Sequence, residues 1–369
     1  MYDEAVTESI LATVDDSTMI DFDIGGPWTT PINLSLLLPF GSTVNPNAGA
    51  VGRCNVDWAV ERRIIDPGNH RQIDALRRCH FEQLAALVHR KSSADELELI
   101  TNAFTAIFVV DDLLDSAVSD IGVSEELSSH MTGFLLAALS DEPLPVLHPD
   151  LPCREQIIAL ANGFTEVTLR LRTIISRPRA HIYFDEMRQY FRGCVMESRS
   201  RRLPKSDFLD YEGVRLRCSA VFAAMEFGAL VDGVDLPPEL RSDPDMQAMR
   251  KATNLCVSYV NDLFSYAKEE ANGEYSNLVK MHRLVYDMDL RTAMRASAAV
   301  IDVHVANYLE AEQRFLARVP RTPEVDGYRE LMRSWMRGNF DWYDGRTDRY
   351  RDYLSTASGE WAQVSAQVP

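Results

Sequence analysis

The chain has 369 residues, of which 46% are hydrophobic and 25% are charged, and it carries a formal net charge of −17. Its length allows a large buried core, and its acidity argues against nucleic-acid binding, which needs clustered Lys and Arg. The six cysteines lack CxxC spacing and the eight histidines form no HExxH motif, so we expect reduced thiols and no zinc site. Neither a membrane-spanning apolar run nor a signal-peptide pattern is present, so we expect a cytoplasmic protein.

Long helical periodicities recur along most of the chain, with few alternating strand-like runs and no Gly/Ser-rich linker. The pattern predicts an all-α protein with one helical domain at 46–356, an irregular N-terminal arm at 1–45 and a C-terminal tail at 357–369. Proline and glycine clusters separate the helices. The helices that we expect are 56–65, 71–90, 94–117, 153–175, 180–201, 207–232, 244–271, 289–318 and 325–356.

An acidic motif, DDLLD, occupies residues 111–115 near the end of the third predicted helix. Asp111 and Asp115 are four residues apart and Asp112 is three residues before Asp115, so the carboxylates can project from one helix face. The preceding stretch, 104–110, is almost wholly apolar, and a solvated acidic face rarely follows such a run. The motif is therefore a candidate site for hard cations.

A second motif, NDLFSYAKE, occupies residues 261–269. Asn261, Ser265 and Glu269 recur at intervals of four residues, which places an amide oxygen, a hydroxyl and a carboxylate on one stripe of a helix. Mg²⁺ takes about six oxygen ligands and is usually held by one or two carboxylates together with substrate phosphates. Two sparse oxygen-bearing helices that face each other would suit a magnesium diphosphate site.

Together these motifs resemble those of microbial-type class I terpene synthases, which carry a DDxxD motif and an Asn/Ser/Glu triad. The family places a diphosphate-sensing Arg 46 residues before the triad Asn, and that offset from Asn261 falls on Arg215. It also carries an Arg-Tyr pair on its last long helix, matched here by Arg349 and Tyr350. The resemblance covers about 45–353 and implies the single-domain α-helical barrel of class I terpenoid synthases.

The resemblance also implies roles for individual residues. The expected metal-site residues are Asp111, Asp112, Asp115, Asn261, Ser265 and Glu269. Three Mg²⁺ ions are expected, two at Asp111 and the third at the triad, while Asp112 and Asp115 orient donors or metal-bound waters. The expected donors to the substrate diphosphate are Arg215, Lys268, Arg349 and Tyr350.

Aromatic rings near these motifs are candidates for stabilising a carbocation. Phe108 lies about one turn before the acidic motif, and Trp335 precedes the Arg-Tyr pair. Further candidates are Phe104, Trp342 and Phe222. In the family, a linker residue and an effector residue follow the sensor Arg, and here they are Cys218 and Ser219. The family often has Asp at the linker position, so Cys218 is a departure.

These features predict a Mg²⁺-dependent cyclase that converts a linear prenyl diphosphate to a cyclic terpene. Farnesyl diphosphate is favoured because C15 enzymes are the commonest in the resembled family, and geranylgeranyl diphosphate is the alternative, since Gly213, Ser219 and Ala224 suggest a roomy cavity. A chain-elongating prenyltransferase should show a second DDxxD in place of the triad. A non-enzymatic helical scaffold should have lost at least one motif. The sequence leaves open a monomer or a homodimer, and the product skeleton.

Overall fold

Helices dominate the computed structural model, which describes residues 18–28, 30–114, 119–140, 142–175, 177–200 and 211–353. The helices are α2 (Ala48–Glu61), α3 (His70–Cys79), α4 (Phe81–Val88), α5 (Ala94–Leu114), α6 (Glu125–Ser140), α7 (Arg154–Ile174), α8 (Arg177–Ser200), α9 (Tyr211–Cys218), α10 (Val221–Val231), α11 (Pro238–Arg241), α12 (Pro244–Ala271), α13 (Leu278–Val285), α14 (Leu290–Leu316) and α15 (Pro323–Tyr343). Two short 3₁₀ helices are η2 (Asp120–Val123) and η4 (Arg351–Tyr353). The expected all-α fold class is confirmed.

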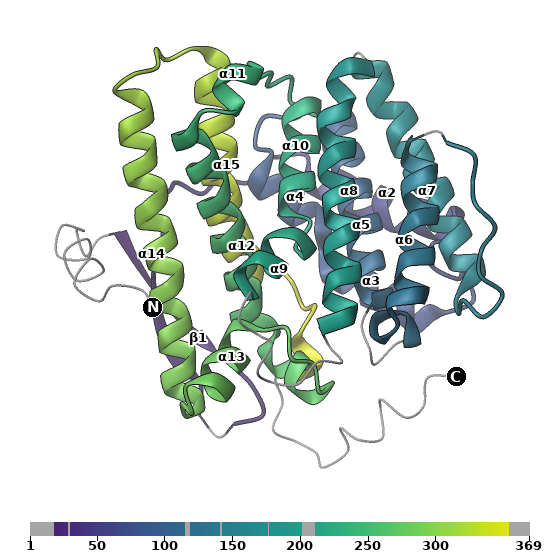
Figure 1. The fold of residues 1–369 in the computed structure, drawn as a ribbon, viewed down its shortest axis with the longest axis horizontal. Coiled ribbons are helices and arrows are strands. Elements are labelled where there is room, and N and C mark those ends of the chain that lie inside the picture. Colours follow the sequence, from purple (N-terminus) through teal and green to yellow (C-terminus); the bar gives the residue numbers. More distant parts are fainter. Residues whose placement is uncertain are drawn as a thin grey trace.

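Helices α5 and α12, which carry the two motifs, lie in the interior of the bundle. Helix α5 packs against α2, α4, α7 and α10, and α12 packs against α9, α10, α14 and α15. In Figure 1, α10 stands between α5 and α12, with α14 at one side of the molecule and α6 and α7 at the other. Most of α5 is buried because its residues are apolar nearly all round, as expected for a helix enclosed on all sides.

The N-terminal part of the described chain contains a β-hairpin, so the expectation of an irregular arm is wrong for residues 19–37. Strand β1 (Met19–Ile24) pairs antiparallel with β2 (Ile32–Leu37), and Phe22 lies opposite Leu34. Apolar residues alternate with polar ones in both strands, which buries one face of the hairpin against α14. That alternation is a strand signal that the proline content of the segment obscured.

A buried carboxyl group anchors this hairpin to α14. The Leu37 backbone N–H donates to Asp302 Oδ1 at 2.7 Å, and the Asp302 side chain is buried. Burial raises the pKa of Asp302 from its ordinary value of 3.8 to about 7, although the hydrogen bond from Leu37 opposes this shift. The folded protein therefore binds a proton at the Asp302 carboxyl group more tightly than the unfolded chain does. This proton binding contributes its full stabilising free energy below about pH 4, and the contribution is lost as the pH rises to about 7.

We therefore expect Asp302→Asn to change how stability depends on pH. Between pH 7 and pH 5 the free energy of unfolding of the unmodified protein should rise relative to the variant by about 1.4 kcal/mol per pH unit. Urea unfolding of both proteins at several pH values measures this difference. Parallel pH profiles for the two proteins would show that Asp302 does not titrate in this range.

Several helices end earlier than the sequence predicted. Helix α15 ends at Tyr343 rather than near residue 356, and the Arg-Tyr pair lies beyond it. Gly345 follows with φ +151°, a conformation that only glycine adopts freely. The predicted helix 71–90 is two helices that meet at His80, whose φ is +52°. The predicted helix 207–232 is broken at Ala220, whose φ is +59°.

Three helices and one helix start were missed by the sequence analysis, and the shortest of the three helices is α11. Helix α6 contains several weak helix formers, namely Ser128, Ser129, His130, Thr132 and Gly133, and it is held in place by packing on α7 and α8. Helix α13 is short and begins at an Asn277 cap, whose side chain accepts from the Val279 and Lys280 N–H groups. Helix α2 begins at Ala48, not at residue 56.

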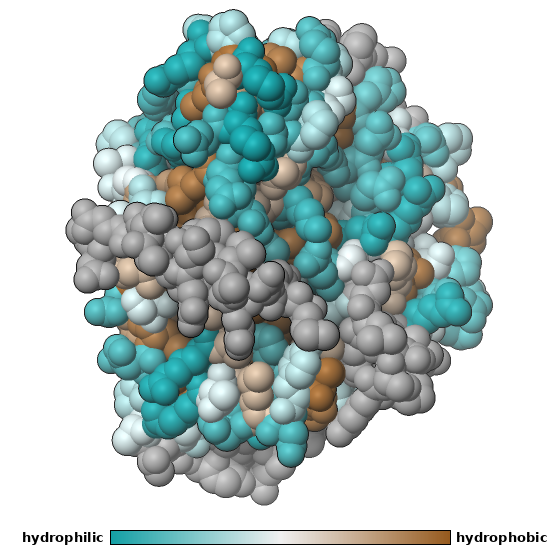
Figure 2. All heavy atoms as spheres, turned by 60° about the vertical axis from the view of Figure 1, so that its left-hand side comes forward, coloured by the Kyte–Doolittle hydropathy of each residue, from teal (hydrophilic) through white to brown (hydrophobic). Residues whose placement is uncertain are grey.

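The face of the molecule that carries α14 is largely polar (Figure 2). Figure 2 shows the side of the molecule that carries α14, where hydrophilic residues dominate and hydrophobic residues gather only in small patches between them. No helix in the described ranges is both long and apolar enough to cross a membrane.

Candidate active site

Asp111 presents its carboxylate to a cavity from the last turn of α5. The side chain is 57% exposed, although dense protein surrounds it and that burial raises the pKa of the carboxyl group. The exposed area of the side chain faces the cavity, which Asp111 lines. Lys268 and Arg349 oppose the pKa shift, so positive charge from α12 and from the segment after α15 reaches this carboxylate.

Asp112, in contrast, is held by an arginine. Arg349 donates to both of its carboxylate oxygens, at 2.6 and 3.4 Å, while its distance to Asp111 is 3.7 Å. The guanidinium also lies 4.9 Å from the centre of the Phe108 ring. A fork-shaped pair of this kind fixes orientation, so Asp112 positions Arg349. Asp115 lies outside the described residues.

On the opposite side of the cavity, Asn261 joins three segments of the chain. Its Oδ1 accepts from Arg215 Nη2 at 2.6 Å. Its Nδ2 donates to the hydroxyls of Tyr343 at 2.6 Å and Tyr350 at 3.1 Å. The offset of 46 residues that the sequence analysis used therefore corresponds to a direct contact between Arg215 and Asn261. Tyr350 reaches this site from the segment after α15.

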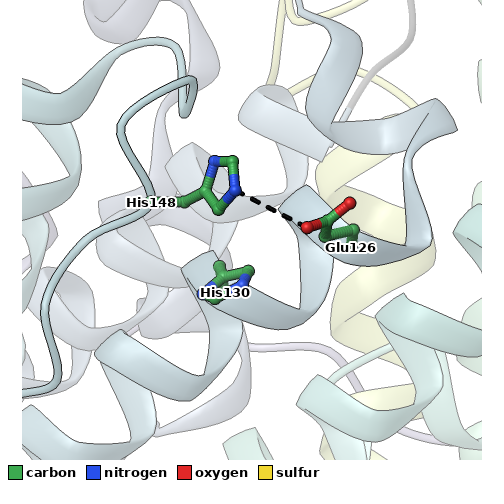
Figure 3. A group of neighbouring side chains, drawn as sticks. All are labelled: Glu126, His130 and His148. Atoms are coloured by element: carbon green, nitrogen blue, oxygen red, sulfur yellow. Dashed lines mark ion pairs between the residues drawn. The ribbon is translucent and has the colours of Figure 1, made fainter.

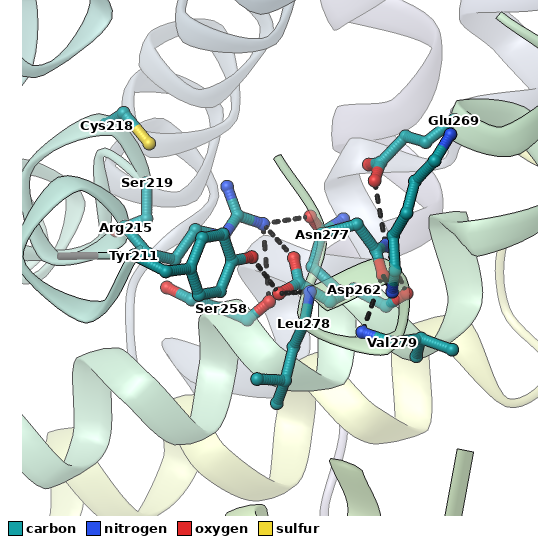
Figure 4. A network of polar contacts seen from close by, with 12 residues as sticks. Tyr211, Arg215, Cys218, Ser219, Ser258, Asp262, Glu269, Asn277, Leu278 and Val279 are labelled. Atoms are coloured by element: carbon teal, nitrogen blue, oxygen red, sulfur yellow. Dashed lines mark hydrogen bonds and ion pairs between the residues drawn. The ribbon is translucent and has the colours of Figure 1, made fainter. Parts of the chain in front are cut away.

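Asp262 is the centre of a buried network that the sequence analysis did not assign (Figure 4). It pairs with Arg215 at 2.7 Å, and it accepts from the Tyr211 hydroxyl and from the Leu278 N–H at 3.0 Å. Burial raises the pKa of Asp262, and Arg215 opposes the shift. The network ties α9 and α13 to α12 and so fixes the direction of Arg215. A charged residue inside a run of buried positions was the available signal.

Asn277 supports Glu269 from the start of α13. Its Nδ2 donates to Glu269 Oε2 at 2.8 Å and to the Asp262 backbone carbonyl at 2.7 Å (Figure 4). Burial raises the pKa of Glu269, and the charge of Asp262 adds to the rise. Ser265 Oγ is buried and makes no hydrogen bond of standard geometry, yet it lies close enough to Glu269 to lower that pKa. The Ser265 hydroxyl is therefore available to a further binding partner.

The two sides enclose a cavity of about 690 Å³, part of which is open to solvent. Asp111, Arg215 and Asn261 line its polar end. Most of the remaining wall is apolar or aromatic, from residues that include Phe104, Ile107, Phe108, Val221, Val257 and Trp335. The site thus combines oxygen ligands and a cation with a wall that is otherwise mostly hydrocarbon-like.

The break between α9 and α10 also borders this cavity, through Cys218 and Ser219. The left-handed conformation of Ala220 ends one helix and starts the next, so the backbone turns at the cavity wall. Ser219 Oγ donates to Asn254 Oδ1 at 3.1 Å, and Cys218 Sγ lies 3.6 Å from Glu197 Oε1.

The expected diphosphate donors line two cavities. Arg215 lines the first, whereas Lys268, Arg349 and Tyr350 line a second of about 1220 Å³ together with Asp112. The Asn261–Tyr350 hydrogen bond connects the two groups.

Among the aromatic candidates, Phe104, Phe108 and Trp335 line the first cavity. Trp342 and Phe222 do not. Trp342 is fully buried and donates to the Cys79 and His80 carbonyls at 3.0 Å, and Phe222 packs under Arg250. The two further candidates Trp342 and Phe222 therefore do not line this cavity.

A second group of possible metal ligands lies on the surface. Glu126 and His130 of α6 face His148 from the following segment, with 3.5 Å between His148 Nε2 and Glu126 Oε1 (Figure 3). His148 Nδ1 accepts the Asp150 N–H at 3.2 Å, so the neutral ring carries its proton on Nε2. That nitrogen faces Glu126, and the contact holds the segment against α6.

Comparisons with known proteins agree with this architecture. The "Crystal structure of a-eudesmol synthase" has a TM-score of 0.68 at 20% identity, covering 83% of this chain and 97% of that one. The chain is 23% identical over 313 residues to 10-epi-cubebol synthase of Sorangium cellulosum (strain So ce56), covering 84% of the chain and 95% of that relative. It is also 23% identical over 312 residues to (+)-T-muurolol synthase ((2E,6E)-farnesyl diphosphate cyclizing) of Roseiflexus castenholzii (strain DSM 13941 / HLO8), covering 83% and 90%.

The fold is therefore that of the class I terpenoid synthases. The model of terpene synthase family 2, C-terminal metal binding, matches residues 102–307, and the chain belongs to this family. The match includes both motifs. The resemblance drawn from the sequence is confirmed, and the protein is a terpene synthase. The alternatives of a chain-elongating prenyltransferase and of a non-enzymatic scaffold find no support in these comparisons.

Proposed function

We propose that the protein is a Mg²⁺-dependent sesquiterpene cyclase that ionises farnesyl diphosphate and closes the hydrocarbon chain into a ring. The observation that carries this proposal is the cavity between α5 and α12. Oxygen ligands line one end of it, and apolar and aromatic side chains line most of the rest. A prenyl diphosphate has the same division, with a charged head on a hydrocarbon tail.

The candidate ligands on the two helices fit magnesium. Asp111 on α5 and the Asn261, Ser265 and Glu269 group on α12 supply only oxygen atoms, which Mg²⁺ prefers. The buried Ser265 hydroxyl, without a standard hydrogen bond, is what such a ligand set would leave before an ion binds. In the proposal, Asp111 holds two ions and the α12 group holds the third. The bound ions would neutralise the diphosphate and make it a better leaving group.

Basic side chains complete the site for the anion. Arg215 is held in place by Asp262, and Arg349 by Asp112, so both guanidinium groups are oriented before substrate arrives. Lys268 and the Tyr350 hydroxyl are the remaining donors of the proposal. When the allylic C–O bond breaks, negative charge collects on the diphosphate oxygens. Preorganised donors in a water-poor site stabilise that charge more than water would.

The apolar end must fold the chain and stabilise the cation. Phe108 lies in the cavity wall, stacks on Phe81 at a ring separation of 4.3 Å, and is one turn from Asp111. Trp335 faces the cavity beside Phe104, with 5.4 Å between the ring centres. The electron-rich faces of such rings attract a cation without reacting with it.

Phe108→Ala is accordingly expected to change the product profile. Loss of one ring in contact with the cation should lower turnover by about tenfold and increase the share of prematurely terminated products, as measured by gas chromatography with mass spectrometry. Phe164→Leu is the control, because Phe164 is fully buried outside the cavity, and it should lower only the melting temperature. A Phe108 variant that loses stability but keeps the product profile would identify the ring as core packing.

The chain length of the substrate is tested by direct incubation. The named relatives include a farnesyl diphosphate cyclase, which favours the C15 substrate, and geranylgeranyl diphosphate is the alternative. The purified protein is incubated with geranyl, farnesyl and geranylgeranyl diphosphate, with and without Mg²⁺, and solvent extracts are analysed by mass spectrometry. A cyclic C15 product that requires Mg²⁺ supports the proposal. A C20 product alone would replace farnesyl by geranylgeranyl diphosphate, and no product from any substrate would overturn the proposed reaction.

A further inference from the structure

An asparagine without a protein partner lines the cavity, most of whose wall is apolar. The Asn339 side chain, on α15, is only 4% exposed. Its Oδ1 is buried and accepts no hydrogen bond, and its Nδ2 donates none within the described part of the chain. Exchanging the oxygen and nitrogen of the amide would not help, because neither position has a partner.

This lack of partners sets Asn339 apart from its neighbours. Except for Trp335, the other uncharged polar side chains that line the cavity each have a protein partner; they are Tyr190, Cys218, Ser219, Ser258, Asn261 and Tyr343. Ser219 and Ser258, for example, both donate to Asn254 Oδ1 at 3.1 Å. Buried polar groups normally have a hydrogen-bond partner, so the Asn339 amide is expected to bind a small molecule inside the cavity.

Trp335 is the second exception, and it lies one turn before Asn339 on the same helix. Its Nε1 is also buried without a partner. Trp335, Asn339 and Tyr343 all line the cavity at intervals of four residues, so they form one stripe of α15. The stripe ends at Tyr343, whose hydroxyl contacts Asn261 at the polar end. A hydrocarbon chain offers no hydrogen bond to an amide or to an indole N–H.

A water molecule is the ligand that matches these groups. Buried waters typically make two to four hydrogen bonds to polar groups that lack other partners. Asn339 offers a donor and an acceptor, and Trp335 offers a donor. The diphosphate of the substrate would bind at Asp111, Arg215 and Asn261, and Asn339 makes no polar contact with any of these residues.

We propose that Asn339 binds a water molecule that captures the final carbocation, so that the product is a terpene alcohol. The inference rests on the proposed function. In the capture step, a lone pair of the water oxygen forms a C–O bond to the cationic carbon. The oxonium then releases a proton to an oxygen of the diphosphate that ionisation has set free. One prenyl diphosphate and one water thus give one alcohol and one protonated diphosphate.

The test uses the full chain, farnesyl diphosphate and Mg²⁺ in water enriched in oxygen-18, followed by mass spectrometry of the extract. The expected main product is an alcohol that carries the label. A product that is only hydrocarbon would overturn the inference and leave the cyclase proposal intact. No turnover with any prenyl diphosphate would overturn both.

Variants then assign the water to Asn339. Asn339→Leu should lower the ratio of alcohol to hydrocarbon by about tenfold, the effect of one lost hydrogen bond. Asn339→Val provides the same test if the Leu variant does not fold. Ser258→Ala is the control, because it removes a cavity hydroxyl that already has a protein partner, and the ratio should not change. An unchanged ratio in the Leu and Val variants would overturn the role of Asn339.

Discussion

Glu269→Gln is expected to lower turnover of the prenyl diphosphate by at least about a hundredfold. Replacing Glu269 by Gln removes the negative charge of this proposed metal ligand but keeps the shape of the side chain. The Gln carbonyl can still accept from Asn277 Nδ2, so the cap of α13 is preserved. Because burial raises the pKa of Glu269, the folded protein gains little stability from this charge, and the melting temperature should not fall.

The neighbouring residue supplies a control for this variant. Glu270 is exposed and forms ion pairs with Lys280 and Arg283 on α13. Glu270→Gln removes the same charge one residue away, and its turnover should stay within about twofold, since exposed ion pairs contribute little. Initial rates of diphosphate release at saturating Mg²⁺ measure both variants. Similar rates for Glu269→Gln and the unmodified protein would remove Glu269 from the proposed metal site.

The two adjacent aspartates of α5 are expected to respond differently to the same substitution. Asp111→Asn should lower turnover by at least about a hundredfold, because the carboxylate faces the cavity as a metal ligand. Asp112→Asn should lower it by about tenfold, the usual range for a residue that orients another. The Asp112 variant weakens the fork with Arg349, so it should also raise the KM for the substrate.

Steady-state kinetics as a function of Mg²⁺ concentration separate these roles. The Asp111 variant should require much more Mg²⁺, and the Asp112 variant should keep the ordinary requirement. A larger loss for Asp112 than for Asp111 would reverse the roles assigned to the two carboxylates.

Much of this site follows from local sequence patterns. Helix α12 begins and ends where its periodicity predicted, at residues 244 and 271, because a Pro start and a long amphipathic run define it. The spacing within each motif follows from helix geometry. The family offset selected Arg215 as a diphosphate donor, but its contact with Asn261 was not predicted, because no local rule relates positions so far apart.

Other features depend on contacts between distant segments. The Arg349–Asp112 pair forms because the chain leaves α15 at Tyr343 and crosses back to α5, which a helix extended to residue 356 would not allow. Asn277 caps the start of α13 and also donates a hydrogen bond to Glu269. The hydrogen bond to Glu269 forms only because α13 lies beside α12. The sequence offered no reason to select Asn339, because its lack of hydrogen-bond partners depends on how several distant helices pack around the cavity.

The central claim is that α5 and α12 hold a magnesium diphosphate between them, and a crystal structure with Mg²⁺ and inorganic diphosphate tests it most directly. We predict metal ions at Asp111 and at the Asn261, Ser265 and Glu269 group, joined by a diphosphate that contacts Arg215. Diphosphate bound elsewhere, or metal found only outside these two helices, would contradict the account.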